Sequence, residues 1–334
     1  RGGFTLESAE AIVDLSVLGD EAPWLEEVMQ GLADKSMLFV REMEDGAVEQ
    51  RICTFDSIRY YALEKLQAAG DVSEAEQRHA HYFMEWIQEQ NTFHLSGNLA
   101  MALELARQEV DNLQVAFERL MRHAPSSALC ILQELTPLIR YEGWFDIGIA
   151  MCSDLVTEAP KLTRSERTEL HTTRSLFYQE LGRLAEARTE LDAALAELST
   201  EATAGQQQGL WLQNARLFML ERNYEDMTHW IAQVDAIAVP EKGTRAKCLA
   251  LKAEAGLRKG EFSEAEKYFT LAWTEGAAGV GAQFRMRIRS FQGLMRCMLG
   301  DLEGGRAIIE EMYRQRRRLG KQTHIAVDLD NLGQ

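Results

Sequence analysis

The feature that most constrains this chain is a repeated tight turn in its second half. Five turn positions follow one another at intervals of 39, 40, 38 and 40 residues: Gly143, Gly182, Arg222, Gly260 and Gly300. Self-similarity with a period of this size is typical of stacked units, each of which buries its apolar face against its neighbours. The repeat therefore predicts a stack of helical hairpins.

The residues around each turn support this prediction. Two residues after the turn comes a large apolar side chain: Phe145, Leu184, Tyr224, Phe262 and Leu302. Five residues after it the side chain is mostly small: Gly148, Ala187, Met227, Ala265 and Gly305. Seven residues before it small side chains again dominate: Thr136, Ser175, Ala215, Ala253 and Gly293. Antiparallel helices approach closely only where the facing side chains are small. Glycine allows a positive φ at the turn, and because Arg222 lacks that freedom we expect Asn223 to share its turn.

The N-terminal region has a mixed pattern. Two short helices are predicted at residues 5–18, capped by Thr5, and 23–33, with Pro23 in the first turn. Extended runs at 36–41 and 48–55 flank Asp45-Gly46, which indicates a β-hairpin, and a helix follows at 56–69. This order is that of a winged-helix domain lacking its first helix. Beyond it, helices are predicted from Ser73, with a capping arrangement to Glu76, and at 99–121.

Three regions follow from these patterns. The fold class is predicted to be mainly α, with a truncated winged-helix domain followed by an α-α superhelix. We expect a winged-helix-like domain at residues 1–72, linker helices at 73–124 and a repeat superhelix at 125–334.

Composition argues against several classes of function. The formal net charge of −16 repels nucleic acid phosphates and anionic lipid. Up to Asp71 we count 15 acidic against 6 basic residues, so direct DNA binding by the winged-helix-like region is not expected. The five cysteines are scattered, no apolar run approaches the roughly 20 residues of a membrane helix, and a cytoplasmic protein is expected.

The sequence contains no constellation that indicates catalysis. His79 and His81 lie two residues apart on a predicted helix, point in different directions and cannot share a metal ion. No acid–base pair or nucleophile elbow stands out from the charged helix surfaces. We therefore predict no enzymatic activity, no metal site and no cofactor in this chain.

The repeats resemble tetratricopeptide repeats. The best copies are Leu181-Gly182-Arg183-Leu184-Ala185-Glu186-Ala187 with Ala194, and Lys259-Gly260-Glu261-Phe262-Ser263-Glu264-Ala265 with Ala272. Trp211 and Phe218 occupy aromatic positions of the family in the third copy. Met227, Gly256 and Met312 depart from the pattern, and the period exceeds the usual 34 residues. The segment from His324 to Gln334 is similar to the start of a sixth repeat.

The N-terminal third resembles the end of the nucleotide-binding module in bacterial STAND-type signalling ATPases, which include large transcriptional regulators. The resemblance is carried by residues 2–11, 32–36 and 55–66, and by the linker-like segments 79–83 and 109–116. It implies that the winged helix reports the nucleotide state of an ATPase while the repeats sense an inducer. No GxxxxGK[ST] motif occurs in the chain. We therefore expect an ATPase domain, with its ATP or ADP and Mg²⁺, upstream of Arg1.

A repeat stack presents the first helix of each pair on its concave side. In this register the inward-facing residues are Glu169, Thr172, Leu212, Arg216, Lys247, Glu254, Arg287 and Ser290. Charges of both signs in a concave surface suit a peptide or a small charged ligand, although a solvated surface would look the same. A basic run at Arg314, Arg316, Arg317, Arg318 and Lys321 either complements a helix C-terminus or forms a docking patch.

The leading functional hypothesis is a regulatory region of a STAND-type signal-transduction ATPase that senses an inducer or a protein partner in the repeat groove. A free-standing tetratricopeptide scaffold for protein assembly is the alternative. An enzyme subunit that needs residues from outside this chain is a third hypothesis. No membrane association is expected for any of them.

Overall fold

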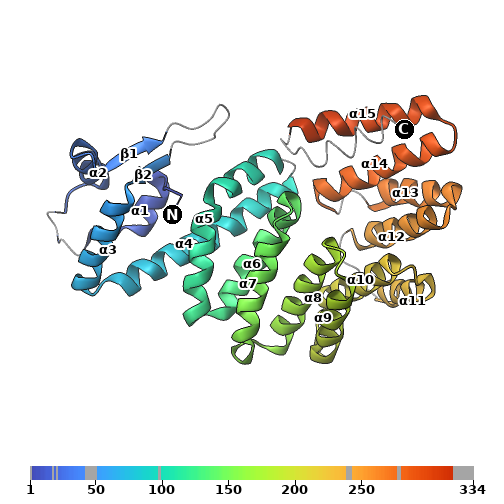
Figure 1. The fold of residues 1–334 in the computed structure, drawn as a ribbon, viewed down its shortest axis with the longest axis horizontal. Helices are drawn as coiled ribbons and strands as arrows, with labels where there is room; N and C mark the ends of the chain where they lie inside the picture. The colour runs from blue at the N-terminus through green and yellow to red at the C-terminus, as the bar shows by residue number, and fades with distance from the viewer. Residues whose placement is uncertain are drawn as a thin grey trace. The chain divides into compact units, whose positions relative to one another are not determined.

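The computed structural model describes residues 2–16, 19, 22–41, 51–96, 99–237, 243–276 and 280–318. The chain divides into two compact units, one comprising Arg1–Phe93 and Met101–Leu135, the other His94–Ala100 and Thr136–Gln334. The prediction of a mainly helical chain with an α-α superhelix is confirmed, because the described residues are mostly helical and the second unit is a superhelix of paired helices (Figure 1). Among the described residues, no helix is long and apolar enough to cross a membrane.

The second unit is built from antiparallel helix pairs. The pairs are α6 (Pro125–Glu142), which belongs to this unit from Thr136 onward, with α7 (Phe145–Thr157), α8 (Arg164–Glu180) with α9 (Leu184–Glu197), α10 (Ala204–Leu220) with α11 (Tyr224–Asp235), α12 (Thr244–Lys259) with α13 (Phe262–Gly276), and α14 (Ala282–Met298) with α15 (Leu302–Arg318). A short 3₁₀ turn, η2 (Ala159–Lys161), precedes α8. Figure 1 shows α8, α10, α12 and α14 on the inner side of the curve of this unit, and α9, α11, α13 and α15 on the outer side.

All five predicted turn positions lie between the paired helices, and all have a positive φ of 62–95°. The prediction for the third turn is wrong in one respect. Arg222 itself adopts φ 62°, whereas Asn223 has φ −90° and caps α11 by accepting a hydrogen bond from the backbone N–H of Asp226. Asn223 acts as the N-cap of α11 and does not take the positive φ of the turn. An N-cap needs a non-helical backbone and a short side chain with an oxygen acceptor, and Asn223 supplies both.

The small residues sit where the paired helices touch. The hydroxyl of Ser175, which is fully buried, donates a hydrogen bond of 2.9 Å to the carbonyl of Ala187. A Cβ atom on Gly305 would lie 2.6 Å from the carbonyl oxygen of Gly293, so this pair of backbones approaches too closely for any side chain. The predicted pairing of small residues before and after each turn is therefore confirmed at these two pairs.

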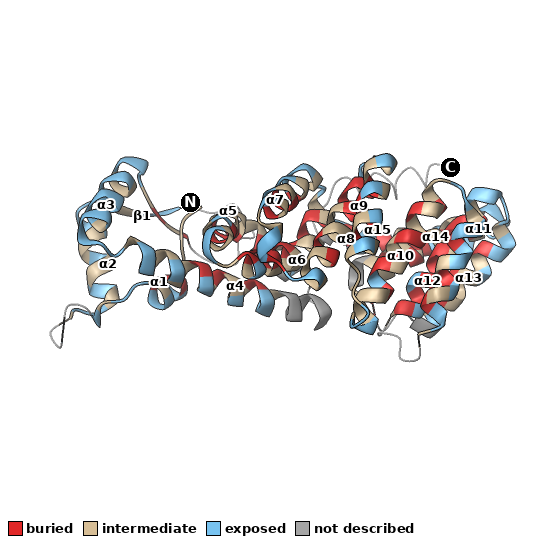
Figure 2. Cartoon of the chain, turned by 90° about the horizontal axis from the view of Figure 1, so that it is seen from below, coloured by how far each residue is buried: buried red, intermediate tan, exposed pale blue. Residues whose placement is uncertain are grey.

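Between these contacts, the three central hairpins each bury a large side chain against their neighbours. Leu191, Ile231 and Phe269 occupy equivalent positions of α9, α11 and α13, and each is at most 1% exposed. They belong to three separate apolar clusters that follow one another along the stack. Figure 2 shows the resulting pattern, with buried residues concentrated on the facing sides of the repeat helices. The core is therefore shared between neighbours, as a repeat stack requires.

The first unit contains α1 (Leu6–Ile12), α2 (Leu25–Asp34), β1 (Leu38–Arg41), β2 (Arg51–Thr54) and α3 (Asp56–Ala69), and all but the adjoining ends of α4 (Val72–Ser96) and α5 (Leu99–His123). The strands are antiparallel, with Leu38 opposite Thr54 and Arg41 opposite Arg51. Phe4 extends this sheet by exchanging two backbone hydrogen bonds with Ile52, at 2.8 and 2.9 Å. The predicted order of helix, helix, hairpin and helix is confirmed.

Several predicted boundaries in the first unit were wrong. The first helix ends at Ile12 instead of residue 18, because β-branched Val13 is extended and Asp14 accepts a hydrogen bond from the backbone of Ser16, which favours a turn. Pro23 precedes α2, and Ser73 lies inside the first turn of α4. Asp45-Gly46 and His324 to Gln334 lie outside the described residues. Thr5 caps α1 as predicted, in a reciprocal capping box with Ser8.

Candidate functional site

Charged side chains of alternating sign run across the first helices of the repeat unit. They are Arg140 on α6, Glu180 on α8, Arg216 on α10, Glu254 on α12 and Arg287 on α14. We call this set the charge ladder. Each member comes from a different hairpin, so a continuous row of charges exists only when all five hairpins are stacked.

Neighbouring members of the ladder are in direct contact at each of its two ends. Glu180 accepts a hydrogen bond of 2.8 Å from an Nη of Arg140 and lies 3.2 Å from an Nη of Arg216. Arg287 donates to both carboxylate oxygens of Glu254, at 2.8 and 2.7 Å. Charge-assisted hydrogen bonds of this kind are about twice as strong as neutral ones and fix the orientation of both partners.

The middle of the ladder is more buried than its ends. The side chains of Arg216 and Glu254 are 14% and 10% exposed, whereas those of Arg140 and Arg287 are 33% and 35% exposed. Burial alone would raise the pKa of Glu180, but the positive charges of Arg216, Arg140 and Arg287 lower it to about 2. Glu180 is therefore fully ionised at neutral pH, and the ladder carries three positive and two negative charges.

Three of the eight predicted site residues, Arg216, Glu254 and Arg287, are members of the ladder. Glu169 and Thr172 are on α8, as predicted, but make local contacts: Glu169 accepts a hydrogen bond of 2.7 Å from Gln206, and Thr172 donates to the carbonyl of Thr168. Glu169 therefore joins α8 to α10, whereas Thr172 bonds within α8.

The other three predicted residues differ from one another. The prediction that Leu212 faces the groove is corrected. Leu212 is 9% exposed and packs in the apolar cluster of α10, α11 and α12 with Cys248 and Leu251, so it belongs to the core. Its apolar side chain gains more from this cluster than from a hydrated face. Lys247 is exposed on α12. Ser290 lies one turn after Arg287 on α14 and is 7% exposed.

Two predicted residues carry buried polar atoms without a hydrogen-bond partner among the described residues. They are an Nη of Arg216 and the hydroxyl of Ser290. Buried polar groups in native proteins nearly always have a partner, because an unmade hydrogen bond costs the group its desolvation free energy. These atoms therefore mark places near the ladder where hydrogen bonding is incomplete.

Sequence reasoning missed Arg140 and Glu180. The ladder does not keep a constant place in the repeat: its members stand 3, 2, 6, 6 and 13 residues before their respective turns. A comparison of equivalent repeat positions cannot detect such a row. The available signal was weaker, namely a charged residue near the end of α6 and α8 beside otherwise apolar positions.

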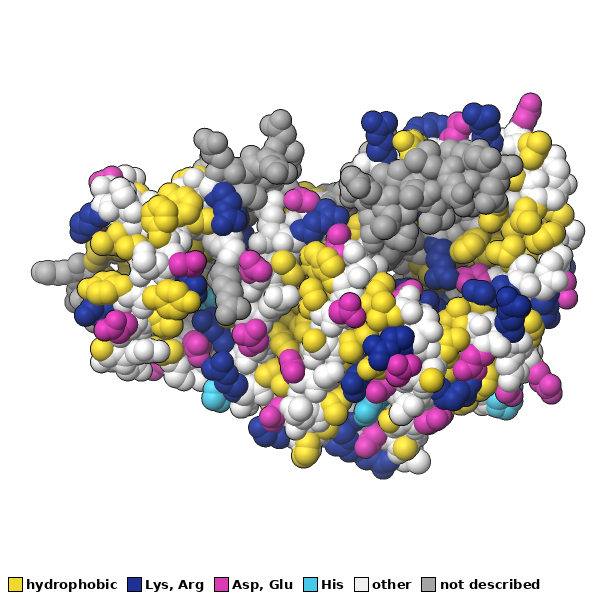
Figure 3. All heavy atoms as spheres, in the orientation of Figure 1, with side chains coloured by type: hydrophobic (Ala, Val, Ile, Leu, Met, Phe, Trp, Pro, Cys, Tyr) yellow, Lys and Arg dark blue, Asp and Glu magenta, His cyan; other side chains and the backbone are white. Residues whose placement is uncertain are grey.

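The histidine pair and the basic run, the other candidates from the sequence, make local contacts or lie exposed. His79 is packed against Phe83, with ring centroids 4.7 Å apart, whereas His81 is exposed and lies 3.1 Å from Glu85, so the two imidazoles point apart as predicted. Arg314 and Arg317 are exposed in the last turns of α15, but Arg316 is 8% exposed, and Lys321 lies outside the described residues. Figure 3 shows positive and negative side chains intermixed on the visible face of the repeat helices.

Comparison with known proteins gives likeness of fold only. No family model matches the sequence, and no curated protein matches it. Among solved structures, a STAND protein with a tetratricopeptide repeat sensor from Pyrococcus horikoshii is 12% identical, with a TM-score of 0.49, over 98% of this chain and 50% of that one. A tetratricopeptide repeat protein from Parabacteroides merdae is 16% identical, with a TM-score of 0.41, over 71% of this chain and 93% of that one. The chain thus spans about half the length of the Pyrococcus protein.

Proposed function

We propose that the repeat unit is a binding module that holds a protein partner, or a charged small-molecule inducer, on the face marked by the charge ladder. The single observation that carries this proposal is the ladder itself, a partly buried row of five charges contributed by five hairpins. The proposal assigns no catalytic chemistry to the chain.

The ladder is difficult to explain by stability alone. Replacing a buried ion pair by apolar residues of similar size is often neutral or stabilising, because desolvation offsets the attraction between the charges. Apolar residues at these five positions would stack the hairpins at least as well. Charges on a binding face, in contrast, select partners and speed their approach. With three arginines against two glutamates, the ladder favours a partner that presents acidic groups.

The experiment compares two charge-neutralising double variants in the full chain. Glu254→Gln with Arg287→Gln keeps side chains that hydrogen bond while it removes the charges of the last two members of the ladder. Arg183→Gln with Glu186→Gln removes an exposed ion pair at the start of α9, on the outer layer, and is the matched control. The partner is first identified by mass spectrometry of proteins that co-purify with the chain, and its affinity is then measured by isothermal titration calorimetry.

We expect the ladder variant to bind its partner at least about tenfold more weakly, since hydrogen bonds to charged groups contribute roughly 1.5–3 kcal/mol. The control variant should bind like the unmodified chain, and circular dichroism should show equal helicity in all three. Equal affinity for the ladder variant and the unmodified chain would discard this face as the binding site.

A finer proposal places this module in a STAND-type signalling ATPase, with transcriptional regulation as its output. Support comes from the resemblance of the N-terminal stretches and from the order of elements expected for a truncated winged helix. Binding at the repeats would then shift the ATPase between resting and active states, which requires that the ligand bind one state more tightly. ATP or ADP with Mg²⁺ would belong to the ATPase domain.

The gene tests this finer proposal directly. A P-loop motif encoded in frame upstream of Arg1 would support it. A start codon immediately before Arg1 would instead support a free-standing scaffold that assembles other proteins, with the ladder face still serving as its binding surface.

A further inference from the structure

A cavity of about 730 Å³ lies within the first unit, and none of its lining residues belongs to the charge ladder. Its walls come from the N-terminal segment and α1, from both strands, and from α3, α4 and α5. Sites for small molecules commonly have volumes of about 300–1,000 Å³ and combine apolar walls with a few polar groups. This cavity meets both conditions.

Aromatic side chains supply the apolar walls. Four phenylalanines line the cavity: Phe4, Phe39, Phe55 and Phe83. Phe83 is 2% exposed, whereas Phe39 and Phe55 are 38% and 54% exposed, with ring centroids 4.8 Å apart. These rings offer flat apolar faces on which a planar apolar group can stack, an arrangement that aromatic side chains favour.

The polar walls carry a local excess of positive charge. Four arginines line the cavity, Arg41, Arg59, Arg119 and Arg122, against three carboxylates, Asp56, Glu76 and Glu118. The surplus of one positive charge contrasts with the net charge of −16 for the whole chain. A surplus of this size matches a ligand with a single negative charge.

Arg119 and Arg122 are the cations best placed to hold an anion. They lie one turn apart on α5, and Arg119 is 3.4 Å from a carboxylate oxygen of Glu76. Burial lowers the pKa of Arg119; the charge and hydrogen bond of Glu76 oppose this shift, and the neighbouring charge of Arg122 adds to it. An anion bound between the two guanidinium groups would relieve this repulsion and accept bidentate hydrogen bonds.

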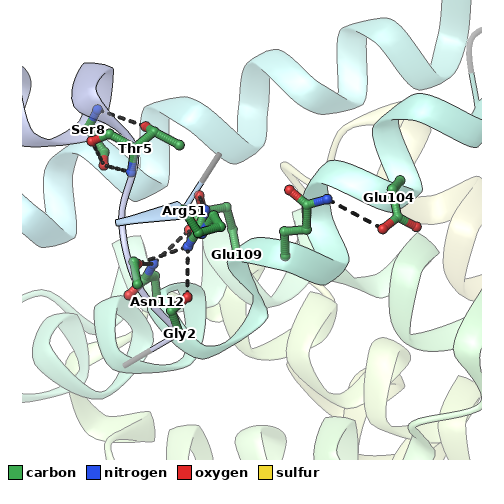
Figure 4. A network of polar contacts seen from close by, with 9 residues as sticks. Gly2, Thr5, Ser8, Arg51, Glu104, Glu109 and Asn112 are labelled. Atoms are coloured by element: carbon green, nitrogen blue, oxygen red, sulfur yellow. Dashed lines mark hydrogen bonds and ion pairs between the residues drawn. The ribbon is translucent and has the colours of Figure 1, made fainter. Parts of the chain in front are cut away.

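Two further residues give the cavity neutral, fixed walls. Burial and the charge of Arg119 lower the pKa of His79 to about 3, so its imidazole is uncharged at neutral pH. Asn112 donates hydrogen bonds to Glu109, at 2.7 Å, and to the carbonyl of Gly3, at 3.0 Å. Figure 4 shows how this network joins α5 to the N-terminal segment. The floor of the cavity is therefore already ordered before any ligand binds, which reduces the entropic cost of binding.

We infer that this cavity binds a small aromatic carboxylate, with its ring among the phenylalanines and its carboxylate on Arg119 and Arg122. The ligand is defined by one negative charge next to a planar apolar body. This site is independent of the charge ladder, since all its lining residues belong to the first unit.

Three probes test the two halves of this inference on the full chain by isothermal titration calorimetry. They are 1-naphthylacetate, its neutral amide, and inorganic phosphate. We expect saturable binding of naphthylacetate, binding of the amide at least about tenfold weaker, and still weaker binding of phosphate. Absence of saturable binding by naphthylacetate would overturn the inference. Equal binding of the amide would refute the role of the charge, and tighter binding of phosphate would refute the role of the rings.

Variants then locate the bound probe. Arg119→Gln with Arg122→Gln should weaken naphthylacetate binding at least about tenfold, while Arg306→Gln with Arg314→Gln, two exposed arginines on α15, should leave it unchanged. If the first double variant loses helicity, Arg122→Gln alone serves in its place, since Arg122 is exposed and its loss should still weaken binding. Unchanged binding in a helical variant would show that the probe binds elsewhere and would overturn the assignment.

Discussion

Arg51 on β2 and Glu109 on α5, which are 58 residues apart in sequence, form a buried ion pair that fastens the β-hairpin to α5. Their side chains are 2% and 6% exposed. Arg51 also donates a hydrogen bond of 2.9 Å to the carbonyl of Gly3, so one guanidinium ties the N-terminal segment, the sheet and α5 together (Figure 4).

Removing the charge from one partner should be costly. Glu109→Gln leaves the Arg51 guanidinium buried without a counter-charge, and we expect a loss of about 3–5 kcal/mol in the free energy of unfolding. The double variant Arg51→Met with Glu109→Leu should lose less than Glu109→Gln alone. Urea denaturation followed by circular dichroism measures the free energy of unfolding of both variants. A Glu109→Gln variant as stable as the unmodified chain would contradict the importance of this pair.

The close approach of α7 and α8 predicts a sharp difference between two glycines. A Cβ on Gly148 would lie 2.6 Å from the ring of Phe177, which is fully buried. Gly148→Ala should therefore destabilise the chain by roughly 1–3 kcal/mol.

Gly209 is the matched control, since it lies inside α10 and a methyl group added to its Cα would meet nothing within 4 Å. Gly209→Ala should stabilise the chain by about 0.5–1 kcal/mol, the ordinary helix preference for alanine. Thermal unfolding of both variants gives the comparison. Equal shifts in Tm would mean that α7 and α8 do not approach as closely as the structure shows.

The third turn predicts a stabilising substitution. Arg222 has φ 62°, a conformation that costs a non-glycine residue roughly 1–2 kcal/mol, and glycine loses part of that gain through its freer unfolded state. Arg222→Gly should therefore raise the free energy of unfolding by up to about 1 kcal/mol. Gly182→Arg, the reverse change at φ 71° in open space, should lower it. Chemical denaturation of both variants gives the two free energies, and changes of the opposite sign would contradict the turn geometry.

The sequence predicted most of the repeat unit because its signals are local and repeated. A turn residue, which is glycine in four of the five copies, a large apolar residue after it and mostly small residues at the helix crossings specify one hairpin, and five copies of that pattern specify the stack. Arg222 stands at the expected spacing although it is not a glycine. In the structure Arg222 itself adopts the positive φ, and Asn223 caps α11.

The binding face was less predictable because it depends on how neighbouring hairpins are offset. Arg216, Glu254 and Arg287 were placed on the inner helices from the repeat register alone. The register could not indicate that Glu180 lies between Arg140 and Arg216, since those contacts join residues 40 and 36 positions apart at different depths of the repeat. Leu212 was misassigned because it shares a helix face with Arg216 but lies deeper in the core.

The free energy of unfolding at acid pH should depend on the protonation of the Glu180 carboxyl group. Its pKa is lowered from 4.5 to about 2, so its contribution to stability is fully present above pH 4.5 and is lost as the pH falls towards 2. A shift of this size corresponds to roughly 3 kcal/mol at neutral pH. Glu180→Gln should be destabilising at pH 7, and its difference from the unmodified chain should shrink between pH 4.5 and 3. Urea titrations at several pH values test this, and a constant difference would contradict the ladder contacts.

Site-specific photo-crosslinking tests the central claim, that the inner helices of the repeat unit form the binding face, most directly. Lys247 is exposed on α12 in the inner layer, and Arg306 is 74% exposed on α15 in the outer layer. Lys247→p-benzoylphenylalanine should capture the partner that co-purifies with the chain, whereas Arg306→p-benzoylphenylalanine should not. Capture from position 306 and none from position 247 would contradict the account.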